Sequence, residues 1–185
     1  MPGSARVLWT AAAALCLAAG AAGCASATSG SPPPARTDPA PSAPSSPAPA
    51  GDPQALAKAA YLGMWQAYVA DARTADYQAP GLDHYTAGGA LSTLTHALYQ
   101  EHQDAEVSRG QPVLHPAVTL VKRSGGDVTQ ADVTDCADGS HWLNYHDGKL
   151  IAGQDVRSRY IIARLQPFNG TWKVTYLNVG LAGTC

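Results

Sequence analysis

The stretch TDCADGSHWLNYHDGK, residues 134–149, concentrates side chains that could do chemistry: one cysteine, three aspartates and two histidines. A zinc site would use Cys136 as a thiolate together with the histidines and aspartates around it. However, His141 and His146 are five residues apart, so on a strand their side chains point to opposite faces and converge poorly. We therefore interpret this stretch as the end of a strand, and we expect no metal here.

The amino-terminal residues have the pattern of an exported lipoprotein. Arg6 is followed by an apolar run from Val7 to Ala22 and by small residues immediately before Cys24. A short positive region, a short apolar region and small residues predict a secretory signal peptide over residues 1–23. We expect a lipid on Cys24 to anchor the protein to the outer face of the cell membrane, with plain secretion as the alternative.

Residues 24–52 are rich in proline, serine and alanine and contain almost no bulky apolar side chains. Such a segment cannot bury enough apolar surface to offset its ordering entropy, so we predict a disordered tether. Residues 53–185 then form one domain. The formal net charge is −2, and no basic patch with interleaved aromatics is present, so nucleic acid is not an expected partner.

Two cysteines remain in the predicted domain, Cys136 and Cys185. An exported protein meets oxidising conditions, in which an even number of cysteines favours a disulfide. Cys136 ends a predicted strand, and the flexible segment GLAGT before Cys185 can bring the last residue of the chain to it. We predict a structural disulfide between these two residues.

The elements that position these residues are predicted to be helices first and strands afterwards. Asp52 and Pro53 form a helix start, and the apolar positions that follow, up to Ala72, cover more than half of the helix circumference. A helical turn between Pro80 and Tyr85 and a helix from Leu91 to about His102 come next. After Gly110 the apolar period changes from near 3.6 to 2, which predicts strands near Val113–Arg123, Asp127–Ala137, His141–His146, Ser158–Phe168 and Thr171–Val179.

The resulting fold class is α+β, with amino-terminal helices packed in a curved antiparallel β-sheet. This order, with the segments YLGMWQAYVADARTADYQAPGLDHYTAGGAL, DVTDCADGSHW and NGTWKVTYLNVGLAGTC, resembles small actinobacterial lipoproteins with a nuclear-transport-factor-two-like domain. The resemblance covers roughly residues 55–185 and implies a cystatin-like cone whose mouth can hold a ligand. Polyketide cyclases, ketosteroid isomerases and many non-catalytic proteins share this fold, so the fold alone does not define a function.

An isomerase of this fold would need a carboxylate base and a pair of hydrogen-bonding groups inside an apolar pocket. Asp135 and Asp132 are the candidate bases, and one face of the last strand, with Trp172, Val174, Tyr176 and Asn178, could form a wall. No complete set of catalytic groups can be assembled, so catalytic residues stay unassigned and no cofactor is expected. The residues that could line a pocket are Tyr61, Tyr68, His84, Tyr85, Trp142, Trp172, Tyr176 and Asn178.

Three functions remain open. The first is a surface-anchored, non-catalytic domain that binds a small apolar ligand or a protein partner in the cell envelope. The second is a small cofactor-free isomerase, cyclase or dehydratase, which a deep cavity with a buried carboxylate near a tyrosine would favour. The third is a dimerisation or scaffolding module, which would form a homodimer through an exposed apolar sheet face.

Overall fold

The computed structural model describes residues 51–185, so the predicted signal peptide, Cys24 and nearly all of the predicted tether lie outside the described residues. The first helix, α1 (Pro53–Ala72), begins where the sequence predicts. The carboxylate oxygens of Asp52 accept the backbone N–H groups of Gln54 and Ala55 at 3.2 and 3.3 Å, and Pro53 occupies the first helical position. This cap satisfies two of the N–H groups that a helix start leaves free.

Two further helices follow, α2 (Gly81–Tyr85) and α3 (Gly88–Gln103). They match the predicted helical turn and second helix, although α3 begins three residues earlier than Leu91. The ring of Tyr85 lies directly on α1 at Gly63, where an added Cβ would come within 2.3 Å of Tyr85 Cε1. Glycine is therefore the residue that allows α2 to approach α1 so closely.

The larger sheet has four antiparallel strands in the order β2-β3-β6-β7. Their bounds are β2 (Ala117–Ser124), β3 (Asp127–Ala137), β6 (Arg159–Phe168) and β7 (Thr171–Val179). Asn169 and Gly170 connect β6 to β7 with φ values of 47° and 81°. Both residues tolerate the positive φ that a two-residue hairpin turn needs, as the sequence predicts.

A smaller antiparallel sheet combines β1 (Glu106–Gly110), β4 (Trp142–His146) and β5 (Lys149–Leu150) in the order β1-β4-β5. The strand β1 has no signal in the sequence, because EVSRG is short and shows no apolar alternation. The first predicted strand also begins later than Val113, which forms only an isolated bridge with Asp138. At Gly110 the φ is +83° and an added Cβ would lie 1.8 Å from the carbonyl oxygen of His141, so only glycine allows β1 and β4 to pair there.

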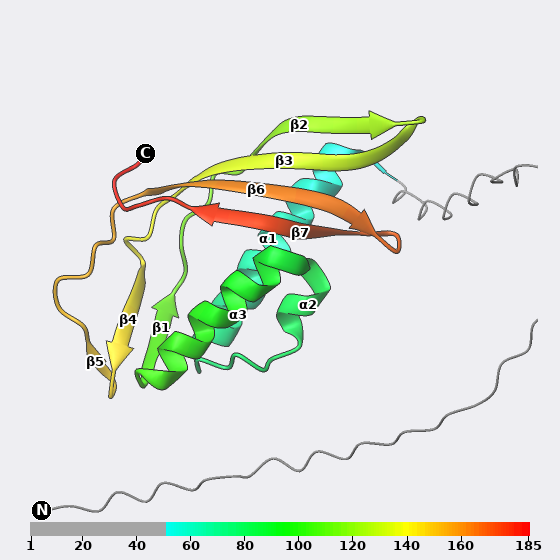
Figure 1. Ribbon diagram of the computed structural model, residues 1–185. Coiled ribbons are helices and arrows are strands. Elements are labelled where there is room, and N and C mark those ends of the chain that lie inside the picture. Colours follow the sequence, from blue (N-terminus) through cyan, green and yellow to red (C-terminus); the bar gives the residue numbers. More distant parts are fainter. Residues whose placement is uncertain (1–50) are drawn as a thin grey trace, which may run out of the picture. The chain divides into compact units, whose positions relative to one another are not determined.

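The helices lie on one side of the four-stranded sheet, and the small sheet lies at one end of the domain (Figure 1). Both α1 and α3 pack against β7, and α1 also contacts β3. The core between these layers is formed by side chains from both helices and from the inner faces of β3, β6 and β7. Its largest fully buried apolar members are Tyr61, Met64, Leu98, Ile161, Leu165, Val133 and Val174.

The last strand, β7, contains a β-bulge, and the predicted pocket wall along this strand is wrong as a result. Val174 pairs with Leu165 and Tyr176 pairs with Arg164, so Thr175 is an extra residue without a partner. Beyond this extra residue, each side chain of β7 lies on the face opposite to the one it would occupy in a strand without a bulge. Trp172 and Val174 point inward, but Tyr176, which is 49% exposed, and Asn178 lie on the outer face. The prediction of one continuous wall that includes Tyr176 and Asn178 is therefore wrong.

The chain end is attached to the start of β6 and the end of β3. Cys136 and Cys185 come together as a disulfide pair, with their α-carbons 5.9 Å apart. The hydroxyl of Thr184 accepts the backbone N–H of Tyr160 at 2.9 Å, and the N–H of Gly183 donates to the carbonyl of Ser158 at 2.7 Å. These contacts hold the last residues along the edge where β6 begins.

Candidate functional site

The carboxylate predicted as a base, Asp135, is a buried structural group. It lies on the inner face of β3 and is 2% exposed. One carboxylate oxygen accepts the hydroxyl of Tyr61 at 2.9 Å, and the other accepts the backbone N–H of His115 at 2.7 Å. Burial, together with the charge of Asp135, raises the pKa of Tyr61 well above its usual range, so this tyrosine remains a donor. Asp135 borders neither of the two cavities described below.

The second candidate base and the residues of α2 lie elsewhere. Asp132 is on the outer face of β3, where it accepts hydrogen bonds from Gln130 at 2.8 Å and from Arg164 at 3.2 Å. His84 and Tyr85 contact each other with their ring centroids 4.6 Å apart, and Tyr85 covers Gly63. The structure thus brings Tyr61 to Asp135 in the core and leaves Asp132 and His84 away from both cavities.

A cavity of about 520 Å³, called here the inner cavity, lies between α1, α3, the small sheet and the ends of β6 and β7. Its two predicted members are Tyr68 and Trp142. Because of the bulge, β7 contributes Leu177 and Val179 in place of Tyr176 and Asn178. The apolar wall includes Trp65, Leu94, Ala97, Ala137, Ile161 and Leu177.

Three aromatic rings from two elements pack together at one side of the inner cavity. Trp65 and Tyr68 come from α1, and Trp142 is the first residue of β4. Their ring centroids lie 5.6 to 5.9 Å apart and the rings meet edge to face. This arrangement places the electron-poor edge of one ring on the electron-rich face of another, which holds the cluster in a defined geometry.

Glu101 lines the inner cavity from the last turn of α3, and Asp155 is the second acidic residue of the lining. Its Oε2 atom is buried and has no hydrogen-bond partner within residues 51–185. Burial, and then the negative charge of Glu106, raise the pKa of Glu101 from 4.5 to about 7. In turn, burial and then the charge of Glu101 raise the pKa of Tyr68, so the phenol stays neutral while Glu101 changes its charge near neutral pH.

A polar rim borders the same cavity along residues 151–158, which connect β5 to β6. The side chain of Gln154 accepts the N–H of Asn144 at 2.7 Å and donates to the carbonyls of Asn144 and Ile151. Asp155 and Arg157 form an exposed ion pair at 2.6 Å, and hydrogen bonds from Arg157 lower the pKa of Asp155 to about 2. These contacts fix the connecting segment beside the cavity.

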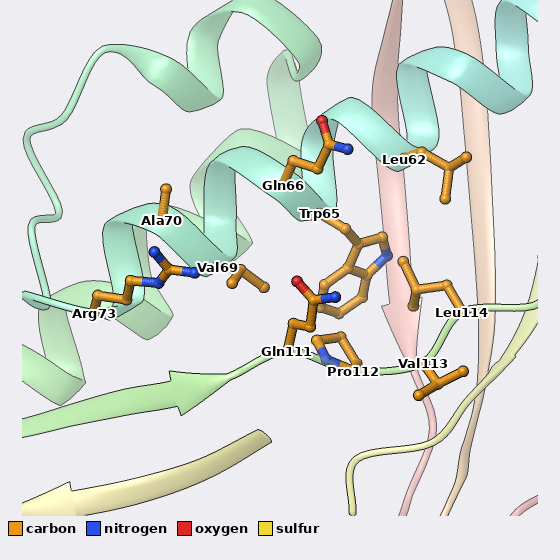
Figure 2. A pocket seen from close by; sticks show the side chains of 10 residues that line it. All are labelled: Leu62, Trp65, Gln66, Val69, Ala70, Arg73, Gln111, Pro112, Val113 and Leu114. Carbon is orange, nitrogen blue, oxygen red and sulfur yellow. The ribbon is translucent and has the colours of Figure 1, made fainter. Parts of the chain in front are cut away.

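A second cavity, also of about 520 Å³, lies on the other side of Trp65 and is called here the outer groove. It runs between α1 and residues 111–114, and Figure 2 shows Trp65 pointing from the helix toward Pro112 and Leu114. The charged side chain among its lining residues is Arg73. The outer groove therefore differs from the inner cavity, whose interior carboxylate is Glu101.

Glu101 is not among the site residues predicted from the sequence. Its signal is the apolar stripe of α3, in which Leu94 and Ala97 are followed at helical spacing by Glu101. A glutamate that continues a core-facing stripe loses hydration when the helix packs, which costs free energy. A charged residue at such a position is therefore a candidate for a functional role. Recognising the signal also requires the small sheet, whose first strand the sequence did not predict.

No protein-family model matches this sequence, and no curated protein matches it. Among solved structures, the crystal structure of the intermembrane space region of the chloroplast protein ARC6 is similar, with a TM-score of 0.45 and 19% sequence identity. The similarity covers 68% of this chain and 97% of that chain. Within residues 51–185, no helix is long and apolar enough to cross a membrane, and no three metal-binding side chains gather.

Proposed function

We propose that residues 53–185 form a non-catalytic binding domain that takes a small, largely apolar molecule into the inner cavity. The observation that carries this proposal is the cavity itself, with about 520 Å³ of space and an apolar wall from both helices and the large sheet. Small-molecule sites in proteins have volumes of about 300 to 1,000 Å³ and combine apolar walls with few polar groups. The inner cavity has this size and this character.

We favour binding over catalysis because the candidate base Asp135 and the predicted pocket residues that border the inner cavity lie in different places. Asp135 uses both oxygens in the core, one of them to bind Tyr61, whereas Tyr68 and Trp142 border the inner cavity. A general base must reach the proton that it removes, and Asp135 has no free oxygen facing the cavity. Its place in the domain is therefore structural.

We also propose that the α+β fold is a nuclear-transport-factor-two-like cone and that the domain works at the outer face of the cell membrane, held by a lipid on Cys24. The order of helices and strands supports the first part, and the signal pattern before Cys24 supports the second. A ligand from the cell envelope, small and apolar, fits this location. The tether would then give the cavity access to molecules away from the membrane surface.

Titration of the full chain with the uncharged fluorophore N-phenyl-1-naphthylamine tests the binding proposal. We expect a saturable rise in fluorescence with one site. Ala97→Phe fills the inner cavity from α3 and should weaken binding about tenfold or more, whereas Gln100→Phe on the exposed face of the same helix should leave binding unchanged. Ala70→Phe, in the outer groove, is a second control. Absence of saturable binding, or loss with Ala70→Phe alone, would contradict the proposal.

A second candidate function is a cofactor-free isomerase, cyclase or dehydratase, and one observation favours it. Glu101 has a pKa of about 7 and lies in the inner cavity near Tyr68, which is the setting that a general base at neutral pH requires. Hydrogen–deuterium exchange at the carbon next to the carbonyl of cyclohexanone tests it. Exchange accelerated by the protein and lost in Glu101→Gln would support catalysis, and exchange at the buffer rate would contradict it.

A further inference from the structure

We propose that the inner cavity selects organic amines, with a positively charged nitrogen held by the carboxylate of Glu101 and by the aromatic rings beside it. This inference rests on the proposed function, because it names the chemical class of the small molecule that the cavity binds. The ligand would carry its apolar body along the wall formed by α3, β6 and β7. It would place its ammonium group at the end where Glu101 and Tyr68 lie.

The first argument is the unmet hydrogen bond of Glu101. Its Oε2 atom is buried beside a cavity and has no partner within residues 51–185. A buried acceptor without a donor is unfavourable, so this position favours a ligand that brings a donor. An ammonium group supplies both the missing N–H donors and the compensating charge, and such charge-assisted bonds are the strong ones.

The second argument is the surrounding aromatic cluster. Trp65, Tyr68 and Trp142 border the same cavity as Glu101 and come from the opposite elements, α1 and β4. Aromatic rings attract cations through their electron-rich faces, and a carboxylate combined with two or three rings is a common way to bind an ammonium group. An alcohol could donate a hydrogen bond to the carboxylate but would gain neither the cation–π attraction nor the charge–charge attraction, and an alkane would gain none of these.

The third argument is the charge distribution around Glu101. Glu106 of β1 adds a second negative charge, and the high pKa of Tyr68 keeps the phenol neutral. Arg157 and Arg159 also line the cavity, but both are already engaged: Arg157 pairs with Asp155, and Arg159 donates to the carbonyls of Gly180 and Asp155. The Glu101 end of the cavity is therefore negative, whereas the outer groove has no acidic side chain among its lining residues.

Three probes that differ only in their polar group test this inference: 4-phenylbutylamine, 4-phenylbutanol and 4-phenylbutanoic acid. Calorimetric titration of the full chain at pH 8 should give an affinity for the amine about tenfold or more above that for the alcohol, and the acid should bind most weakly. In Glu101→Gln the amine should fall to the level of the alcohol, whose own affinity should not change. Glu106→Gln, which removes a nearby charge outside the cavity lining, should retain most of the preference.

The pH dependence is the readout that a purely structural role of Glu101 would not produce. The amine stays protonated between pH 8 and 5.5, whereas Glu101 gains a proton over this interval because its pKa is about 7. The preference for the amine should therefore decrease on acidification in the wild type. This measurement needs no variant, so it decides the question even where Glu101→Gln fails to fold.

The outcomes separate this inference from the proposed function. Equal affinity for the amine and the alcohol in the wild type, or a preference that Glu101→Gln retains, would overturn the amine inference and leave the binding function intact. Binding of N-phenyl-1-naphthylamine without binding of 4-phenylbutylamine would also overturn the amine inference and leave the binding function intact. Failure of all four probes to bind would overturn the binding function itself.

Discussion

Asp135 is a fully buried carboxylate and Glu101 a half-buried one with a buried Oε2 atom, and their surroundings are opposite. Asp135 lies on β3 with a donor on each oxygen, the hydroxyl of Tyr61 and the N–H of His115. Glu101 lies on α3 beside a cavity, and its buried oxygen has no donor in the described part of the chain. The comparison shows that burial alone does not mark a binding group: a satisfied carboxylate stabilises the fold, and an unsatisfied one beside a cavity is available to a ligand.

The two regions also differ in what their surroundings do to the side chains. Successive side chains of β3 face opposite sides of the sheet. Asp135 therefore binds Tyr61 on the inner face, and Cys136 pairs with Cys185 on the outer face. Glu101 lies in the last turn of α3, where the free carbonyl groups of the helix end disfavour a negative charge. The β3 end is thus fixed on both faces, whereas the Glu101 region has a charge that its own surroundings do not stabilise.

The largest expected effect comes from removing the covalent link of the β3 end. The double variant Cys136→Ser and Cys185→Ser opens a loop with a sequence separation of 49 residues. In the chain-entropy model such a loop accounts for about 4 kcal/mol of the free energy of unfolding. Urea denaturation of wild type and variant should show this loss, and dithiothreitol should destabilise the wild type to the same degree. A change below about 1 kcal/mol would show that the chain end contributes little.

The next effect concerns Asp135 itself. Asp135→Ala leaves the buried hydroxyl of Tyr61 and the part-buried N–H of His115 without an acceptor, which should lower the free energy of unfolding by about 3 kcal/mol. Asp132→Ala, on the outer face of the same strand, is the matched control. Its contacts with Gln130 and Arg164 are at the surface, so it should cost less than about 1 kcal/mol. Equal losses in the two variants would remove the distinction between a satisfied interior carboxylate and a surface one.

The smallest effect is the pH dependence that Glu101 imposes on stability. The folded pKa of about 7 lies above the ordinary value of 4.5, so the folded state holds the proton more tightly. The contribution is complete below about pH 4.5 and is lost as the pH rises through about 7. Because the side chain is only half-buried and partly screened by solvent, we expect this contribution to the free energy of unfolding to be about 1 kcal/mol. The difference in unfolding free energy between wild type and Glu101→Gln should therefore shift by this amount from pH 4.5 to 8. A constant difference would contradict the raised pKa.

Local signals in the sequence account for much of the fold. The Asp52 cap with Pro53 marks the start of α1, and Asn169 with Gly170 marks the β6–β7 turn, because each depends on neighbouring residues alone. The strand β1 has no such signal. It is defined by pairing with β4 more than thirty residues later, and Gly110 reveals this contact only when His141 is placed beside it.

The candidate site depends even more on distant contacts. Tyr68 and Trp142 are aromatic and could be predicted as pocket residues, but their meeting with Glu101 requires α1, α3 and β4 to be in place. In the sequence, Glu101 continues the apolar stripe of α3, but nothing local shows that a cavity lies beside it. Asp135 and Tyr61, in contrast, are residue types that the sequence offers for a site. Only their hydrogen bond in the core shows that this pair is a structural contact and not a reactive one.

The bulge in β7 has a consequence for comparing this chain with relatives. Thr175 is one residue more than β6 can pair, yet Val174 before it and Leu177 after it both face the interior. An insertion or loss of a single codon here would change the length of the gene without changing which side chains of β7 line the cavity. Alignments of homologous sequences should therefore place a one-residue gap at Thr175. A prediction that assumes strict alternation across β7 would assign outer-face residues such as Tyr176 to the cavity wall.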